Sequence, residues 1–320
     1  MQERAAGVAI RPMQRADLDA SDRALRLAFG TRLGLPDPMQ FRGDSRILQP
    51  RWATCPEAAF VAETAGRIAG SIVGMDWGRV FVLGPLSVAP DFAGRGIARK
   101  LVRELISRAD ARGFDLAGLF TFPDSPTHIR LYESFGFVPN TLTPVMAKEL
   151  APSVKTPDAA GSFALYSALS RAQRDAALAD CRAVSGSVFP GLDLSREIAA
   201  IAAQGLGETL LLRAGGGLAG FALCHIGPGS EAGSGTLFVK FAACRPGDQA
   251  GFERLLASCE ALARAKGVPR IVAGCNTARE EAYRQMRARG FRAEIIGVAM
   301  HRPGQTGYNR PGIFAIDDWR

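Results

Sequence analysis

The pattern of apolar and polar positions repeats itself along the chain with an offset of 150 residues. Residues 63–73 and 213–223 each read as a strand, a glycine-containing tight turn and a second strand, which together predict a β-hairpin. Each hairpin is followed by an apolar strand, at residues 84–88 and 237–242, then by a Pro/Gly loop and an amphipathic helix. The repeat therefore predicts two copies of one α/β unit.

Each of the two predicted helices has one apolar face, as helices packed on a sheet do. The apolar face of the first helix consists of Ile97, Leu101, Val102, Leu105 and Ala109. That of the second consists of Phe252, Leu255, Leu256, Cys259 and Leu262. Gly113 and Gly267 follow at the position where a helix commonly ends in a left-handed residue. A further strand and a short helix complete each copy.

A length of 320 residues suits two domains. We expect domains at residues 1–150 and 163–300, joined by a linker at 151–162 that is rich in Pro, Ser and Gly and lacks apolar periodicity. Residues 301–320 have no helical period and are expected to form an ordered tail. The apolar residues of this tail that can pack are Ile313, Phe314, Ile316 and Trp319.

Composition narrows the range of partners. The net charge is +8, but the arginines are spread along the chain, so we expect no nucleic acid partner. A mildly positive surface suits an anionic cofactor, although an arginine-rich genome explains it equally well. The six cysteines form no C-x-x-C pair, so we expect reduced, mostly buried thiols and no metal site. Apolar stretches are short, which predicts a cytoplasmic protein without a membrane partner.

The clearest chemical signal is a strand ending at Val88, a Gly-x-Gly turn at 94–96 and a helix beginning near Ile97. Free backbone N–H groups, the helix dipole and the close approach that glycine allows attract phosphate to such a place. Positive charge is added by the side chains of Arg95, Arg99 and Lys100. A diphosphate fits. Gly-x-Gly also occurs in dinucleotide sites, but their third glycine is replaced here by Arg99, and no Gly-Lys-Ser/Thr loop occurs.

Residues 86–98, followed about 35 residues later by residues 129–137, resemble the GNAT N-acetyltransferase superfamily. The likeness covers residues 9–148, and a degraded version extends over residues 163–300. It implies an α/β (α+β) fold with two tandem GNAT-like domains, each a mixed, mostly antiparallel sheet flanked by helices. It also implies that the sheet is splayed in the middle and that acetyl-coenzyme A, the cosubstrate, lies in the cleft.

The same resemblance implies a set of cofactor-binding residues. The backbone of the strand would pair with the pantetheine arm, and the amides of residues 94–98 would hold the pyrophosphate. The full set is Leu86, Ser87, Val88, Ala93, Gly94, Arg95, Gly96, Ile97, Ala98 and Arg99. The family pattern has Gln or Arg where this chain has Ala93, and because that side chain is auxiliary to the backbone amides we expect at most a modest loss of affinity. Compensation by Arg95 is one hypothesis.

Acetyl transfer to an amine needs a proton for the departing thiolate, whose conjugate acid has a pKa of about 8.5. The resemblance places Tyr132 at the position of that acid; the alternative is an aromatic residue that anchors a short helix. His128, on the same helix face, is a base, a ligand of cofactor phosphate or a surface residue. Asp76 and Glu63 are weaker candidates for a base that acts through water, because acidic residues at strand ends are usually solvated.

The second copy lacks these features. Residues 241–252 contain no Gly-x-Gly turn, and Met286 aligns with Tyr132. A thioether cannot donate a proton, although Tyr283, one turn away, remains an alternative acid. We therefore favour a structural domain that helps to wall the substrate cleft over a second catalytic site.

The leading hypothesis is an acetyl-CoA-dependent N-acetyltransferase that acts by direct transfer on a primary amine of a small molecule or peptide, with Tyr132 as general acid. One alternative is a non-catalytic acyl-CoA sensor, suggested by Ala93 and the degraded second copy. Another is an acyl or aminoacyl transferase with a different donor. Acceptor specificity is expected from the loops at 30–56 and 124–127. A monomer fits, because two domains can pack together as single-domain relatives dimerise; a homodimer is the alternative.

Overall fold

The computed structural model describes residues 7–151, 163–304 and 307–320, so nearly all of the predicted linker lies outside the described residues. The first half of the chain contains strands β1 (Ala9–Pro12), β2 (Ala59–Thr64), β3 (Arg67–Trp77), β4 (Val80–Val88), β5 (Leu116–Thr121) and β6 (Val138–Glu149). Its helices are α1 (Leu18–Arg32), α2 (Leu48–Thr54), α3 (Ile97–Arg112) and α4 (Pro126–Glu133).

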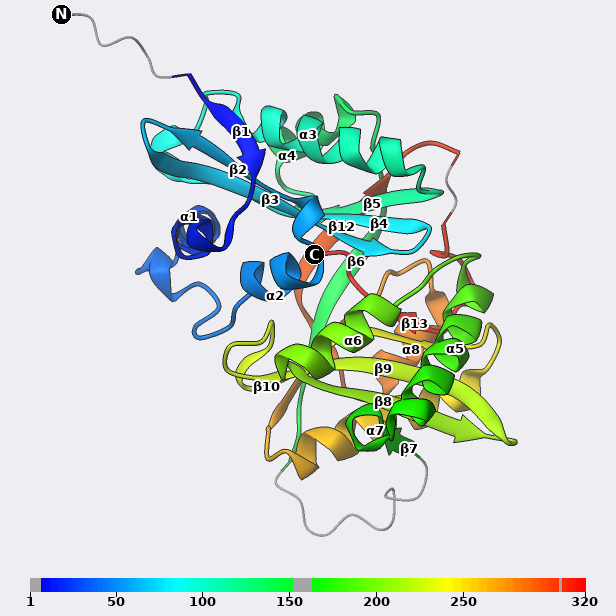
Figure 1. Cartoon of the computed structure of the whole chain (residues 1–320). Helices are drawn as coiled ribbons and strands as arrows, with labels where there is room; N and C mark the ends of the chain where they lie inside the picture. The colour runs from blue at the N-terminus through cyan, green and yellow to red at the C-terminus, as the bar shows by residue number, and fades with distance from the viewer. Residues whose placement is uncertain (1–6, 152–162, 305–306) are drawn as a thin grey trace, which may run out of the picture.

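The second half repeats this order with small changes (Figure 1). Its strands are β7 (Phe163–Leu165), β8 (Gly207–Ala214), β9 (Gly217–Gly227), β10 (Gly233–Cys244), β11 (Arg270–Gly274), β12 (Arg292–His301) and β13 (Ala315–Ile316). Its helices are α5 (Arg171–Val188), α6 (Ser195–Gln204), α7 (Gln249–Ala265) and α8 (Glu280–Ala288).

All of these strands form one 13-stranded sheet in the order β1-β2-β3-β4-β5-β12-β6-β11-β10-β9-β8-β7, with β13 beside β10. Only the β4–β5 and β10–β11 pairings are parallel among the described strands. The predicted mixed, mostly antiparallel α/β architecture is therefore correct. The two copies, however, share a single continuous sheet instead of having one sheet each.

The shared sheet results from an exchange of strands between the halves. Strand β12 of the second half lies between β5 and β6, with Val298 opposite Thr121. Strand β6 of the first half lies between β12 and β11, with Ala147 opposite Val272. Each half thus completes its sheet with a strand of the other half, and the predicted domain bounds describe the repeat in sequence and not a division in space.

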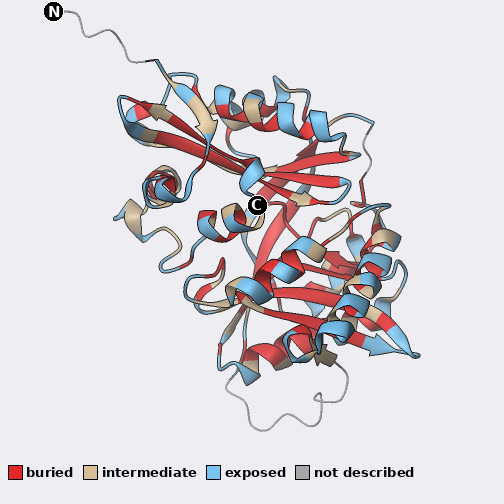
Figure 2. Cartoon of the chain, viewed as in Figure 1, coloured by how far each residue is buried: buried red, intermediate tan, exposed pale blue. Residues whose placement is uncertain are grey.

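Alternation along the strands sends side chains to helices on both faces of the sheet. In β2, Phe60 packs with α3, whereas Val61 packs with α1 and α2. In β8, Leu211 belongs to a core that includes residues of α5 and α6, while Leu212 belongs to a core with α7. The core at Leu211 also contains Trp77 of β3, so the halves share a buried interior (Figure 2).

The sheet opens at two equivalent places. β4 and β5 pair only from Val80 and Leu116 to Leu83 and Leu119, although β4 runs on to Val88. β10 and β11 likewise pair only as far as Val239 and Ala273. The first opening leaves a cavity, whereas the second is filled by the tail of the chain.

Candidate active site

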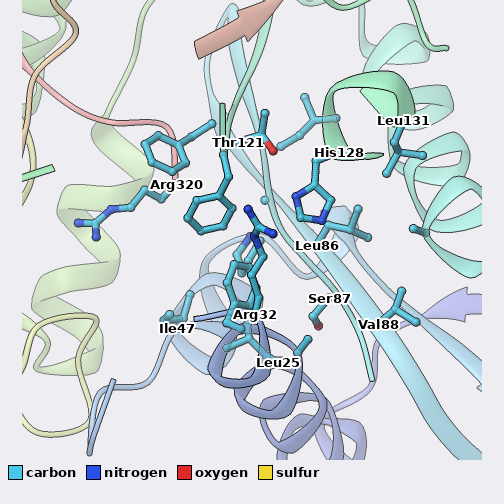
Figure 3. Close-up of a pocket in the computed structure, with 18 of the residues that line it drawn as sticks. Leu25, Arg32, Ile47, Leu86, Ser87, Val88, Thr121, His128, Leu131 and Arg320 are labelled. Carbon is cyan, nitrogen blue, oxygen red and sulfur yellow. The ribbon is translucent and has the colours of Figure 1, made fainter. Parts of the chain in front are cut away.

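A cavity of about 640 Å³ lies where β4 and β5 separate (Figure 3). One part of its wall is formed by the end of β4, the loop that follows and the first turn of α3, and α4 forms another. The opposite part, which we call the acceptor end, is formed by α1, by residues of the second half, and by Leu33, Phe41, Arg42, Ile47, Arg51, Phe120 and Phe122. Each part supplies a different kind of chemistry.

The end of β4 offers a free backbone edge to the cavity. On one side it pairs with β3, with Ser87 opposite Ser71 and Leu86 opposite Ile72. On the side of β5, no described strand pairs with it beyond Leu83. The Gly84 carbonyl accepts from Arg51 at 2.8 Å. The peptide groups of Leu86 to Val88 on this side can hydrogen-bond to an extended, amide-containing ligand as a neighbouring strand would.

This edge leads to the N-terminus of α3. Gly94 and Gly96 have φ values of 74° and 72°, a left-handed conformation that glycine adopts without a steric penalty. Gly96 is the N-cap of the helix, no side chain caps it, and the first helical bond runs from the Lys100 amide to the Gly96 carbonyl at 3.2 Å. The amides of the first turn are thus free to bind an anion, and the helix dipole favours one.

The structure brings nearly all of the predicted cofactor-binding residues to the cavity. The lining includes Leu86, Ser87, Val88, Ala93, Gly94, Gly96, Ile97, Ala98 and Arg99. Arg95 is the exception, because its guanidinium lies over the ring of Phe92, 5.3 Å from the centroid, and donates to the carbonyl of Asp91. Its cofactor contact stays a prediction, as do those of the other residues.

Tyr132 lies on α4 with its side chain in the cavity wall. It is 9% exposed and packs in the core beneath α3, so it does anchor the short helix. Burial is the one cause of the shift in its pKa, with no contribution from a neighbouring charge or hydrogen bond. Burial raises the pKa of Tyr132, so the phenol stays protonated at neutral pH and keeps a proton to donate.

His128 also faces the cavity and is half-buried, so it is not a solvated surface residue. Its ring lies near Leu86 and Arg32 (Figure 3). Burial, and then the charge of Arg32, lower the pKa of His128 below 6.5, while Asp124 opposes them. At neutral pH the imidazole is therefore uncharged and can accept a proton.

The two carboxylates considered as bases lie elsewhere. Asp76 accepts from Arg112 at 2.7 Å, and Glu63 accepts from Arg11 at 2.8 Å. Neither lines the cavity. Both are engaged in ion pairs, which agrees with a structural role.

In the second half the corresponding cleft is occupied by the tail. Strand β13 pairs with β10, with Ile316 opposite Ala242, and the Cys244 amide donates to the Phe314 carbonyl at 3.0 Å. The tail thus fills the edge that is free in β4. The predicted packing of Ile313, Phe314, Ile316 and Trp319 is correct, since all four are buried.

The N-terminus of α7 is also closed. Asp248 is its N-cap, and its carboxylate accepts from the Gly251 amide at 2.8 Å. Met286 is fully buried in the core beside α7. The second half therefore lacks the free strand edge and the free helix terminus of the first. Asp248 is a sequence signal of the closed helix terminus, because aspartate is a common N-cap residue.

The second half instead supplies part of the acceptor end, which sequence reasoning missed except in general terms. The residues concerned are Glu231, Phe238, Ile295, Trp319 and Arg320. Trp319 reaches this place because Gly118 of β5 leaves room for its ring, which a Cβ at 118 would meet at 2.5 Å. A glycine inside a strand is the sequence signal of such an approach.

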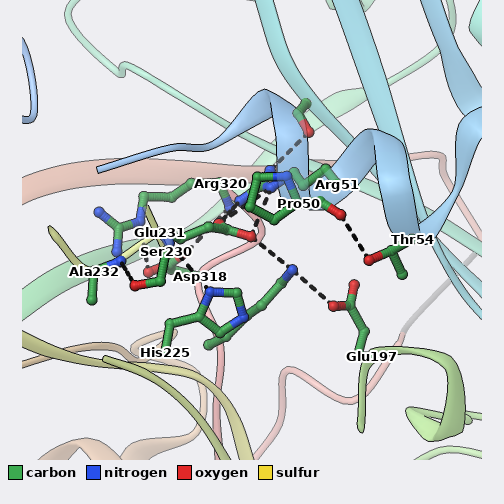
Figure 4. Close-up of polar contacts among 12 residues, drawn as sticks. Pro50, Arg51, Thr54, Glu197, His225, Ser230, Glu231, Ala232, Asp318 and Arg320 are labelled. Atoms are coloured by element: carbon green, nitrogen blue, oxygen red, sulfur yellow. Dashed lines mark hydrogen bonds and ion pairs between the residues drawn. The ribbon is translucent and has the colours of Figure 1, made fainter. Parts of the chain in front are cut away.

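A buried ion network lies behind this wall (Figure 4). Glu231 accepts from Arg51 at 2.5 Å and from Lys240 at 2.8 Å. Lys240 also donates to Glu197 at 2.9 Å, and Glu197 accepts from the indole of Trp77. Burial alone would raise the pKa of Glu231, but Arg51 and Lys240 hold it well below its usual range. The network therefore stays charged and joins α2 to β10 and α6.

Comparison with known proteins agrees with this geometry. A sequence model of the acetyltransferase (GNAT) family matches residues 30–137. An acetyltransferase of Sodalis glossinidius is 37% identical over 82 residues, which cover 26% of this chain and 58% of the relative. An acetyltransferase of Yersinia enterocolitica is 35% identical over 82 residues, which again cover 26% of this chain and 58% of the relative. The chain thus matches a little over half the length of these relatives.

The fold of the whole chain has counterparts among solved structures. A Pyrococcus horikoshii protein described as an acetyltransferase has a TM-score of 0.70 at 15% identity, covering 98% of this chain and 95% of that one. A GCN5-related N-acetyltransferase from Sphaerobacter thermophilus has a TM-score of 0.59 at 16% identity, covering 95% and 98%. The match to the GNAT family model, at residues 30–137, lies in the half that contains the cavity, and the likeness over the whole chain is one of fold.

None of the helices in the described residues is long and apolar enough to cross a membrane. No group of three or more His, Cys, Asp or Glu side chains among these residues is placed to hold a metal ion. All six cysteines are free and buried, as predicted.

Proposed function

We propose that the protein transfers the acetyl group of acetyl-coenzyme A to a primary amine of a small molecule or peptide, in the cavity of the first half. The observation that carries the proposal is the continuity of the free edge of β4 with the uncapped N-terminus of α3. An arm of amides ending in a diphosphate matches that path in both shape and charge. Tyr132 and His128 face the same cavity, at the end where the thioester would lie.

The reaction follows from these positions. The amine nitrogen attacks the thioester carbonyl carbon, and a C–N bond forms while the C–S bond breaks. Tyr132 donates its proton to the departing thiolate, and neutral His128 accepts the proton that the amine nitrogen loses. The second half serves as scaffold and as the wall of the acceptor end.

Calorimetric titration of acetyl-coenzyme A tests the cofactor site. We expect one site per chain, and no binding in Gly96→Val, because a β-branched residue is strained at φ 72° and crowds the helix terminus. Gly113→Val is the matched control, since Gly113 has φ 68° at the other end of the same helix. It should cost stability without changing affinity. No binding by the unaltered protein would refute the proposal, and two sites would refute the assignment of the second half as scaffold.

A pH profile tests His128. Protonation below its depressed pKa removes the base, so kcat/KM should fall on the acid side, below pH 6.5. In His128→Gln this limb should disappear, leaving only the limb that belongs to the acceptor amine. In Arg32→Gln the limb should move to higher pH, because the repulsion that lowers the His128 pKa is gone. Identical profiles for all three proteins would rule out His128 as the base.

A further inference from the structure

The acceptor end of the cavity is lined largely by aromatic rings. Phe29 and Phe41 stack with centroids 5.3 Å apart, and Phe122 lies 6.3 Å from Phe120. Phe238 of the second half lines the same end. Such walls suit a ligand with an apolar body.

The charges set into these walls are mostly positive and mostly balanced. Three of the four arginines that line the cavity at this end have carboxylate partners. These pairs are Arg32 with Asp124 at 2.8 Å, Arg51 with Glu231 at 2.5 Å, and Arg320 with Asp318 at 2.8 Å. Lys240, the second partner of Glu231, is balanced by Glu197 at 2.9 Å.

Arg42 is the arginine without a balancing charge. Its guanidinium donates to the backbone carbonyl of Glu231 at 2.9 Å, and it forms no ion pair with any carboxylate of the described residues. Arg320 lies nearby, with its guanidinium 4.8 Å from the centroid of the Phe238 ring. Its Nη2 is buried and has no hydrogen-bond partner in the described structure. Burial, and then repulsion by Arg320, lower the pKa of Arg42 to about 10.

The loop around Arg42 is held in place although it is irregular. Arg42 has a φ of 62°, a backbone conformation that residues other than glycine rarely adopt. Arg26 donates to the carbonyls of Phe41, Gly43 and Ser45 at 2.6 to 2.7 Å. Asp44 accepts from the Ser234 amide at 2.8 Å, which ties the loop to the hairpin of β9 and β10. A strained residue held so firmly at a cavity indicates a binding role.

We infer that the acceptor amine carries a carboxylate on an apolar body, and that Arg42 and Arg320 bind this carboxylate. The inference rests on the acetyl transfer proposed above. One uncompensated positive charge matches one carboxylate better than a phosphate dianion, and the planar guanidinium presents paired N–H donors to two carboxylate oxygens. Binding would satisfy the free Nη2 of Arg320 and reduce the repulsion between the two arginines.

The test compares aryl-bearing amino acids, in which the spacing of amine and carboxylate varies, with their matched carboxamides. The best acid should have a kcat/KM about tenfold or more above its amide, because a charge-assisted contact is lost in the amide. In Arg42→Gln this preference should vanish, chiefly through a higher KM for the acid. Arg42→Lys should restore part of it. Arg46→Gln, in the same loop but outside the cavity, should keep it.

A second measurement separates the two proposals. An aryl-alkyl carboxylate without an amine, 3-phenylpropionate, should bind the unaltered protein by calorimetry and bind Arg42→Gln more weakly by a similar factor. Binding that depends on Arg42, without acetyl transfer to any amine, would refute the transferase proposal and keep the carboxylate site. Transfer with equal use of acids and amides would refute the carboxylate site alone. Neither binding nor transfer would refute both.

Discussion

Replacing Tyr132 by Phe is expected to lower kcat by about 10²- to 10⁴-fold, the usual contribution of a positioned general acid. The phenol is buried in the cavity wall and its raised pKa keeps it protonated, so the variant loses a proton donor and little else. Neither a neighbouring charge nor a hydrogen bond contributes to that pKa shift, so removal of the hydroxyl disturbs no ion pair. The affinity for acetyl-coenzyme A and the melting temperature should therefore hardly change.

Steady-state kinetics with saturating acetyl-coenzyme A and the best amine of a broad panel would measure this effect. Tyr283→Phe is the matched control, because Tyr283 lies on α8, the counterpart of α4, and packs beside the core of the second half. It should retain full turnover. Equal kcat in Tyr132→Phe and the unaltered protein would show that Tyr132 only anchors the helix, and a loss confined to Tyr283→Phe would move the acid to the second half.

The features that could be predicted from the sequence are those determined by local pattern. The hairpin repeat, the periodicity of α3 and α7, and the glycines at 94 and 96 each depend on residues close together in the chain. They identify which faces are apolar and where a helix terminus stays open. Asp248 is a further signal of this local kind, since an aspartate before a helix is a common N-cap.

The features that could not be predicted depend on which distant segments meet. The alternation of apolar and polar residues along β6 and β12 indicates the buried face of each strand. This pattern does not depend on which strand lies next to it. The exchange of these strands was therefore invisible. The same applies to the tail: Ile316 reads as a residue that packs, yet nothing near it specifies the free edge of β10 as its partner. The acceptor end could not be predicted, because Arg42 and Arg320 meet only when the strands are exchanged and the tail pairs with β10.

The second large effect is expected in stability, from Glu231→Gln. Glu231 is 2% exposed, and its carboxylate accepts from Arg51 and Lys240, both buried. The amide keeps the shape but removes the charge, so that Glu197 alone faces two buried cations. Breaking a buried ion pair in this way costs about 3–5 kcal/mol of unfolding free energy, because the remaining charge is desolvated without compensation.

Denaturant unfolding would measure this loss, with Glu280→Gln as the control. Glu280 pairs with Arg284 one turn away on the exposed face of α8, and such surface pairs contribute about 0–1 kcal/mol. Adding Lys240→Met to Glu231→Gln restores the charge balance between Arg51 and Glu197, so the double variant should recover part of the loss. A loss in Glu231→Gln no larger than in Glu280→Gln would contradict a desolvated network.

The difference in unfolding free energy between the unaltered protein and Glu231→Gln should depend on pH, in a direction set by the Glu231 pKa shift. Its pKa in the folded protein lies well below that of an unfolded glutamate, which is about 4.3. The stabilisation by Glu231 is therefore fully present above that unfolded value and is lost as pH falls through the folded pKa. The difference in unfolding free energy between the unaltered protein and Glu231→Gln should be constant near neutral pH and should become smaller in acid. Because Arg51, Glu231, Lys240 and Glu197 come from both halves, the loss should appear as one lower transition for the whole chain.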